Sequence, residues 1–152
     1  MLKRTKIGDV EVEYDANATR AKYATVAGTI DNCTCGSCEN YRGTRDAVYP
    51  SKFLALLSEL GIDPKKETEL THYADDDSDR TYGHPAHGHF AFVGRIVGTP
   101  LGIGHETKTP FDFWIGLGVH PTTSATYGEN DSMVDLCFYV ADIPQAMPQA
   151  ET

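Results

Sequence analysis

Apolar and polar residues alternate over several short stretches of the chain, and this pattern predicts β-strands. Val10, Val12 and Tyr14 alternate with two glutamates, as in a strand that has one face in water. Gly8 and Asp9 precede this run and suit a two-residue turn, so a β-hairpin is expected at the start of the chain. Similar runs predict further strands at residues 69–73, 90–97, 111–119 and 134–140.

One stretch has the periodicity of a helix. Apolar residues between Phe53 and Leu60 recur at spacings of three and four, which gathers them on one helical face. Pro50 suits the first turn of this helix, because its missing N–H does no harm there. Gly61 suits the C-terminal cap, so a helix is expected between Pro50 and Gly61.

Two other segments are less regular. A short helix is expected at residues 39–48, interrupted at Gly43. Residues 15–28 are ambiguous, and the stretch from Tyr23 to Val26 would suit the extension of a strand. Because strands outnumber helices and the connections between strands are short, the expected fold class is α+β. The simplest arrangement is a mainly antiparallel sheet with one or two helices on one face.

Length and composition favour one ordinary globular domain. The chain has 152 residues, of which 40% are hydrophobic and 23% are charged, and this is enough to bury one core. The pattern contains no repeat and no second core, so residues 1–143 are expected to form a single α+β domain. The polar end, residues 144–152, is expected to be a flexible C-terminal tail.

The charge balance narrows the choice of partners. The chain has 13 basic and 22 acidic residues, which give a net charge of -9. Phosphate backbones favour clustered Lys and Arg, so no nucleic-acid binding is expected, whereas a basic protein partner or self-association is compatible with this charge. No apolar run reaches the roughly 18 residues of a membrane span. The N-terminus also lacks the apolar segment of a secretory signal, so we expect a cytoplasmic protein without a membrane partner.

Three of the four cysteines form a short motif. Cys33, Cys35 and Cys38 lie within six residues, whereas a secreted disulfide scaffold would spread its cysteines along the chain. The turn from Cys35 to Cys38 brings two sulfurs to one side, Gly36 permits such a turn, and Cys33 adds a third sulfur. We therefore expect a metal site, with zinc as the metal and an iron–sulfur cluster as a less favoured alternative.

A tetrahedral structural zinc needs a fourth ligand, and the histidines are the main candidates. A loop over residues 84–89 would place His84, His87 or His89 on the metal if it folded over the cysteines. His-x-His on a strand puts both rings on one face, so these histidines would also suit a separate metal site. A polar loop that happens to contain three histidines explains the spacing equally well. The remaining candidates for the fourth ligand are His72, His105, His120 and Cys137.

Other interpretations of the cysteines stay open. Cys35 and Cys38 have the spacing of a redox dithiol, although no βαβ pattern surrounds them. Alternatively, the thiols are buried and inert, as expected for Cys137 in its alternating strand. A metal-dependent enzyme that uses the histidines is also compatible with the pattern. No complete catalytic motif is present, and the acidic run at residues 75–79 lacks the Gly and Glu of an EF-hand.

The cysteine motif and its surroundings resemble a group of small uncharacterised bacterial proteins. These share a Cys-x-Cys-x-x-Cys-x-Asn motif, a helix that ends in Leu-Gly-Ile-Asp-Pro, a Tyr-Gly turn and a Phe-Val-Gly-x-Ile strand. Here the corresponding segments are residues 33–40, 60–64, 82–83 and 92–96. The sequence departs from the pattern of this group at residues 84–89. It implies a bacterial or phage origin and implies no activity.

The function expected from the sequence is therefore a metal-binding domain that serves in protein interaction or regulation. The alternative is a thiol redox protein, or a metal-dependent enzyme, that uses Cys35 and Cys38 or the histidines of residues 84–89.

Overall fold

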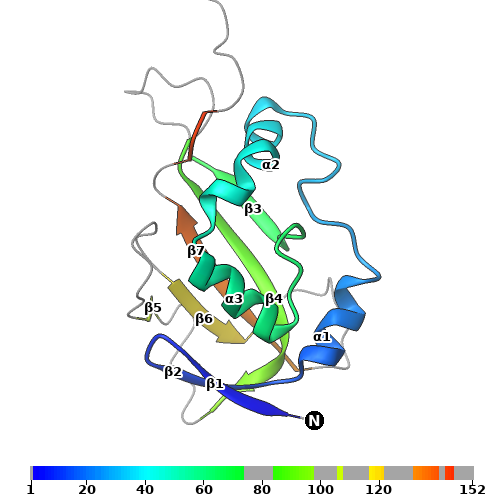
Figure 1. Cartoon of the computed structure of the whole chain (residues 1–152), viewed down its shortest axis with the longest axis vertical. Coiled ribbons are helices and arrows are strands. Elements are labelled where there is room, and N and C mark those ends of the chain that lie inside the picture. Colours follow the sequence, from blue (N-terminus) through cyan, green and yellow to red (C-terminus); the bar gives the residue numbers. More distant parts are fainter. Residues whose placement is uncertain are drawn as a thin grey trace, which may run out of the picture.

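The fold is known from a computed structural model, which describes residues 2–73, 84–97, 106–107, 117–121, 132–140 and 143–145. In these ranges the chain forms three helices and seven strands (Figure 1). In chain order they are β1 (Lys3–Ile7), β2 (Val10–Tyr14), α1 (Ala16–Tyr23), α2 (Gly36–Val48), α3 (Ser51–Leu60), β3 (Glu69–His72), β4 (Ala86–Ile96), β5 (Glu106–Thr107), β6 (Leu117–Pro121) and β7 (Met133–Val140).

The strands build one sheet in the order β1-β2-β4-β7-β6-β5, and β3 also pairs with β4. Every pairing among the described strands is antiparallel. The α+β class with a mainly antiparallel sheet is therefore confirmed. No helix in the described ranges has both the length and the apolar character needed to cross a bilayer.

Two local predictions are confirmed together with their physical reasons. In the N-terminal hairpin Ile7 pairs with Val10, and Gly8 at the turn has a φ of 60°. Gly61 ends α3 with a φ of 81°, a left-handed conformation that favours glycine. The backbone N–H of Ile62 then donates to the carbonyl of Leu57 at 2.9 Å, which satisfies an orphan carbonyl of the last turn.

Three elements differ from the sequence prediction. Residues 16–23 form a helix and do not extend a strand, because the Asp15 carboxylate caps the N–H of Ala18 at 2.9 Å. Helix α2 begins at Gly36 and continues through Gly43 without a break. Strand β4 begins at Ala86, four residues before the predicted start, so it includes the histidines that were expected in a loop. Of the strand predicted at 111–119, residues 111–116 lie outside the described residues.

The core lies between the sheet and helices α2 and α3, which cover the same face (Figure 1). The Tyr49 ring packs edge-on against Phe53, Phe90 and Phe138, with ring centroids 5.4, 6.0 and 5.5 Å apart. Edge-to-face aromatic contacts of this kind add to the stability from apolar burial. The buried residues of α2 include Cys38, so the core-facing side of this helix also carries the end of the cysteine motif.

Helix α1 completes one edge of β4. Strands β2 and β3 pair with different parts of this edge, and the stretch around Ala91 and Val93 lies between them. The Tyr23 hydroxyl donates to the carbonyl of Ala91 at 2.9 Å and accepts from its N–H at 3.1 Å. The Thr19 hydroxyl accepts from the N–H of Val93 at 3.0 Å. Side chains of α1 thus replace the backbone partners that a continuous neighbouring strand would give.

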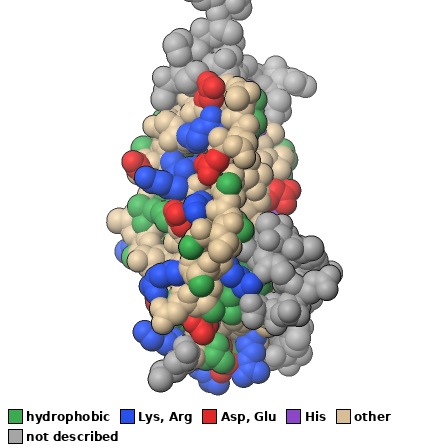
Figure 2. All heavy atoms as spheres, turned by 90° about the vertical axis from the view of Figure 1, so that its right-hand side faces the viewer, with side chains coloured by type: hydrophobic (Ala, Val, Ile, Leu, Met, Phe, Trp, Pro, Cys, Tyr) green, Lys and Arg blue, Asp and Glu red, His purple; other side chains and the backbone are tan. Residues whose placement is uncertain are grey.

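The molecular face on the right of Figure 1 carries mixed charge. Figure 2 shows basic and acidic side chains interspersed over this face.

Candidate metal centre at the start of α2

The cysteine motif spans the entry into α2. The N–H of Cys33 donates to the carbonyl of Ile30 at 3.2 Å, which closes a turn just before the motif. Cys35 is the N-cap residue, and Cys38 lies in the first helical turn. The backbone N–H groups of a first turn have no partner inside the helix, and they give this end a partial positive charge. This partial charge attracts negative groups to the helix end, but burial opposes ionisation of Cys38.

The three sulfur atoms converge. Cys33, Cys35 and Cys38 place them all within 4.8 Å of one another, close enough to hold one metal ion. Cys33 Sγ and Cys35 Sγ are 3.2 Å apart. The described cysteines are free thiols, and burial increases inward, from exposed Cys35 through half-buried Cys33 to buried Cys38. A bound ion would therefore sit at the boundary between solvent and core.

The three thiols differ in acidity. The backbone N–H of Cys35 donates to Cys33 and lowers the pKa of the Cys33 thiol, with smaller contributions from the neighbouring thiols and the Arg42 charge. Burial raises the pKa of Cys38 to about 12, and hydrogen bonds to the other two thiols add to this. The electrostatics therefore favour Cys33 as the first thiolate, and a cation must displace the proton of Cys38.

His72, the last residue of β3, approaches the same cluster. Its Nε2 lies 3.9 Å from Cys38 Sγ, and its ring packs edge-on against Tyr41 with centroids 5.9 Å apart. Burial, and secondarily the nearby His84, lower the pKa of His72, so its imidazole is neutral at physiological pH. Neutral imidazole is the form that coordinates metals. We call Cys33, Cys35, Cys38 and His72 together the cysteine centre.

His84 is a second imidazole close to the cysteine centre, since its charge affects the pKa of His72. Its Nδ1 is buried and has no hydrogen-bond partner among the described residues. Buried polar atoms normally have a partner, so this nitrogen is available to a ligand.

The structure does not bring His87 and His89 to the cysteines. Both lie on β4, where His72 pairs with Ala86 and Thr71 pairs with His87. Because side chains alternate along a strand, His87 and His89 lie on the face opposite the one that carries His72. Their ligand atoms instead fall within 4.8 Å of one another and of Cys137 on β7. The loop expected to fold over the cysteines is thus a strand with its histidines on the far face.

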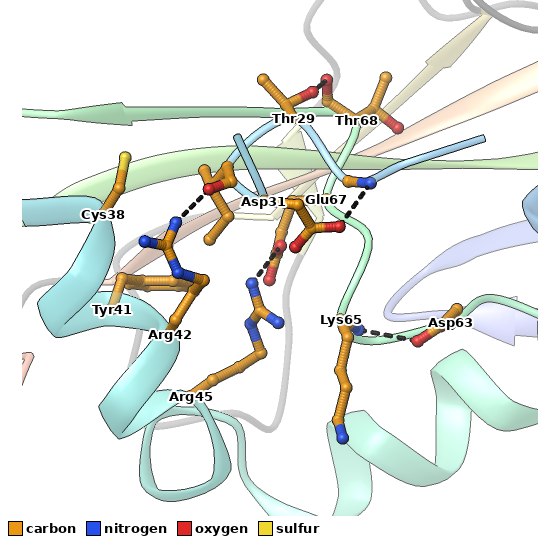
Figure 3. Close-up of polar contacts among 12 residues, drawn as sticks. Thr29, Asp31, Cys38, Tyr41, Arg42, Arg45, Asp63, Lys65, Glu67 and Thr68 are labelled. Carbon is orange, nitrogen blue, oxygen red and sulfur yellow. Dashed lines mark hydrogen bonds and ion pairs between the residues drawn. The ribbon is translucent and has the colours of Figure 1, made fainter. Parts of the chain in front are cut away.

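A buried polar network lies next to the cysteine centre, and the sequence pattern did not predict it. Figure 3 shows its residues Tyr41, Arg45 and Glu67. Arg45 Nη2 forms an ion pair with Glu67 Oε2 at 3.0 Å, and Tyr49 donates to Glu67 Oε1 at 2.9 Å. Tyr41 donates to the Tyr49 hydroxyl at 2.5 Å, and the Tyr41 ring contacts His72. The network thus supports the imidazole from within the core.

Nothing in the local sequence distinguishes Glu67, which follows two lysines in a polar connection. Its side chain is nevertheless completely buried. Burial raises the pKa of Glu67, while the Arg45 charge opposes this shift.

Two sequence candidates, the acidic run 75–79 and His105, lie outside the described residues. The described part of the C-terminal segment includes Pro144, whose carbonyl accepts from the Asn40 side chain at 2.9 Å. No protein-family model, no curated protein and no solved structure matches the chain.

Proposed function

We propose that the chain is a zinc-binding domain in which Cys33, Cys35, Cys38 and His72 hold one structural metal ion. The observation that carries the proposal is the convergence of three sulfurs, with the imidazole of His72 3.9 Å from one of them. Three cysteines and one histidine form a common closed zinc site.

The spacing of the ligand atoms supports a tetrahedral ion. Zinc–sulfur and zinc–nitrogen bonds of ~2.3 and ~2.0 Å place tetrahedral sulfur atoms about 3.8 Å apart, and sulfur about 3.5 Å from nitrogen. The 3.9 Å between Cys38 and His72 is slightly longer than the sulfur–nitrogen value, and the 3.2 Å between Cys33 and Cys35 is shorter than the sulfur–sulfur value. The ligand atoms within 4.8 Å of one another are the three sulfurs without His72, so a bound ion would require the imidazole to move closer to Cys33 or Cys35. A closed shell of this kind leaves no position for substrate, which favours a structural role over a catalytic one.

The proposed ion would fasten two parts of the chain that are distant in sequence. Cys38 and His72 are 34 residues apart. A metal that joins them would hold the entry of α2 against β3, and its binding free energy would be folding free energy. The domain stabilised in this way would then present its surface to a protein partner, either a basic one, given the net charge of -9, or a second copy.

We place the protein in the cytoplasm, because its clustered cysteines do not suit the disulfide scaffold of a secreted domain. The resemblance of the cysteine motif to small bacterial proteins supports a bacterial or phage origin. Zinc is preferred to an iron–sulfur cluster because the fourth group near the thiols is an imidazole, which suits zinc well.

The test is metal analysis combined with thermal unfolding, on protein purified without a His-tag or chelator. We expect zinc in the wild type and a loss of about one equivalent in Cys38→Ser and in His72→Ala, with a lower Tm. Ser37→Ala lies inside the motif but removes no ligand, so it should keep both metal and Tm. His84→Ala tests whether that imidazole is the fourth ligand. Unchanged metal content and Tm in Cys38→Ser would refute the proposal.

One observation favours thiol redox chemistry as the second candidate. The sulfurs of Cys33 and Cys35 are in contact at 3.2 Å, so these two would form a redox pair in place of Cys35 and Cys38, the pair expected from the spacing. In that case the purified protein would contain no metal at the cysteines. Mild oxidation would then remove two maleimide-reactive thiols in the wild type and leave Cys33→Ser with one of the pair still reactive.

A further inference from the structure

We propose that the sheet carries a second, independent metal centre on its opposite face, where His87, His89 and Cys137 bind a borderline-soft divalent cation such as Zn²⁺. We call these three residues the histidine cluster. The histidine cluster shares no residue with the cysteine centre. Its own nitrogen and sulfur donor atoms determine which cation it would bind.

Two neighbouring strands position the cluster. His87 and His89 are separated by one residue on β4, so both side chains lie on one face of the sheet. Cys137 on β7 is the register partner of His89. The imidazole and thiol ligand atoms of all three residues lie within 4.8 Å of one another. The two rings are nearly perpendicular, at 88°, with centroids 4.9 Å apart.

The supporting strands are central and continuously paired. β4 and β7 form an unbroken ladder from Ala86 opposite Val140 to Val93 opposite Met133. Ligands on such strands are held more closely than ligands on loops, so less ordering is required when an ion binds. A preformed set of three donors is what a metal site needs from its scaffold.

The donor set selects the class of cation. Imidazole nitrogen and thiolate sulfur suit zinc and related transition metals, whereas magnesium and calcium prefer oxygen. Two histidines and one cysteine supply three donors, one fewer than a closed tetrahedral zinc shell. The cluster therefore has the protein-ligand count of a site in which an exchangeable molecule takes the remaining position.

Nearby negative charge supports a cation at this place. Glu69 on β3 is the register partner of His89, and buried Asp135 lies on β7 two residues before Cys137. Carboxylates beside the donor atoms favour a divalent cation there.

The two centres are separated by the sheet itself. His72 lies on the helix-covered face of β3, whereas the preceding residue, Thr71, pairs with His87 on the other face. Each centre should therefore load without the other. This independence distinguishes failure of the second centre from failure of the proposed function, because each has its own set of variants.

The experiment is a Co²⁺ titration of the metal-free full chain, followed by absorption spectroscopy. The wild type should bind about two equivalents, the second of which is lost in the His87→Gln/His89→Gln double variant and retained in Cys38→Ser. Thr71→Ala, the register partner of His87 without a ligand atom in the cluster, is the control and should keep both. Full stoichiometry in the double variant, or a wild type whose only bound ion depends on Cys38, would overturn the proposal.

A second measurement uses the wild type alone, so it tests the proposal even if the variants fail to fold. X-ray absorption of the zinc-loaded wild type reports the average ligands of all bound ions. The cysteine centre would supply three sulfurs and one nitrogen, and the histidine cluster would supply one sulfur and two nitrogens. Two bound ions would therefore share four sulfurs and three nitrogens. If the protein bound a single ion with three sulfur ligands and one nitrogen ligand, the histidine cluster would hold no metal, and its side chains would interact only through hydrogen bonds.

Discussion

The Tyr23 hydroxyl makes two hydrogen bonds that the sheet itself lacks. It contacts both the N–H and the carbonyl of Ala91, and the side chain is only 2% exposed. Removing the oxygen would leave two buried backbone groups without a partner, and water has little access to replace it. An unsatisfied buried group costs more than the average net value of a hydrogen bond.

We therefore expect Tyr23→Phe to lower the free energy of unfolding by about 1–3 kcal/mol. Urea denaturation followed by circular dichroism measures this change. Tyr73→Phe is the control, because the Tyr73 side chain is 47% exposed, and its effect should stay within about 0.5 kcal/mol. Equal stabilities of the two variants would show that the hydroxyl of Tyr23 does not matter for the edge of β4.

The contrast between Cys35 and His72 shows which site residues a sequence can reveal. The three cysteines are neighbours in the chain, so their spacing alone predicts convergent sulfurs. His72 reaches them only because β3 pairs with β4, and Cys137 meets His89 only through the register of β4 and β7. Pairings of this kind depend on the packing of the whole sheet, which no local pattern encodes.

At the scale of elements, helix α2 is joined to the segment before β3 by the ion pair of Arg45 and Glu67. Both side chains are buried, and Tyr49 also donates to the Glu67 carboxylate. Removing one partner of such a pair leaves the other charge without compensation in the core, which is more costly than replacing both by apolar groups.

We expect Glu67→Ala to destabilise the protein by about 3–5 kcal/mol. The double variant Arg45→Met/Glu67→Leu should recover much of this loss, because neither charge remains buried. Chemical denaturation of the two variants and the wild type gives the comparison. A double variant as unstable as Glu67→Ala would mean that the carboxylate acts through its bond with Tyr49, and the explanation based on an unpaired charge would be wrong.

Elements were predictable where one local signal dominated. Helix α3 has an apolar stripe, and Gly61 supplies the left-handed cap, so both ends were clear. Helix α1 is short and polar, and its signal was the Asp15 cap alone, which is weaker than the apparent strand pattern from Tyr23 to Val26. The start of β4 was missed because Gly88 suggested a loop, whereas a side chain there would collide with Phe138 at 2.4 Å.

At the scale of the whole molecule, the Glu13 side chain connects three strands through hydrogen bonds. From β2 it accepts hydrogen bonds from Arg4 on β1, at 2.9 and 2.7 Å, and from Arg95 on β4, at 2.6 Å. The hydrogen bond from Arg95, followed by that from Arg4, lowers the pKa of the Glu13 carboxyl below its usual 4.5. The ionised carboxylate is therefore favoured in the folded protein.

The sign of the pH dependence follows from this lowered pKa. The contribution of Glu13 to stability is present above its unfolded pKa of 4.5 and is lost as the pH falls through the folded pKa. The stability difference between the wild type and Glu13→Gln should therefore shrink below that pH, as measured by urea unfolding from neutral pH to about pH 3. Glu11→Gln, which removes only an exposed 3.5 Å ion pair with Arg4, should show a smaller effect. A constant difference would contradict the lowered pKa.

The fold class followed from counting alternating runs, but the order of the strands did not. β2 and β3 share one edge of β4, and helix α1 fills the stretch between them. To predict that two strands share one edge, one must know where each strand ends. Here those ends depend on hydroxyl groups of α1, which lies about 70 residues before its contacts on β4 in the chain.

The four residues of the cysteine centre are unevenly spaced along the chain, and this affects the order in which they would bind an ion during folding. Three of its four residues lie within six positions of the chain, whereas His72 lies 34 residues beyond Cys38. Short loops close in ~10–100 ns, whereas pairing of distant strands is far slower. An incoming ion would thus be captured first by the thiolates of an unfolded chain and would keep an exchangeable position until β3 docks. The rate at which the ion stops exchanging with a competing chelator would then record when the sheet closes.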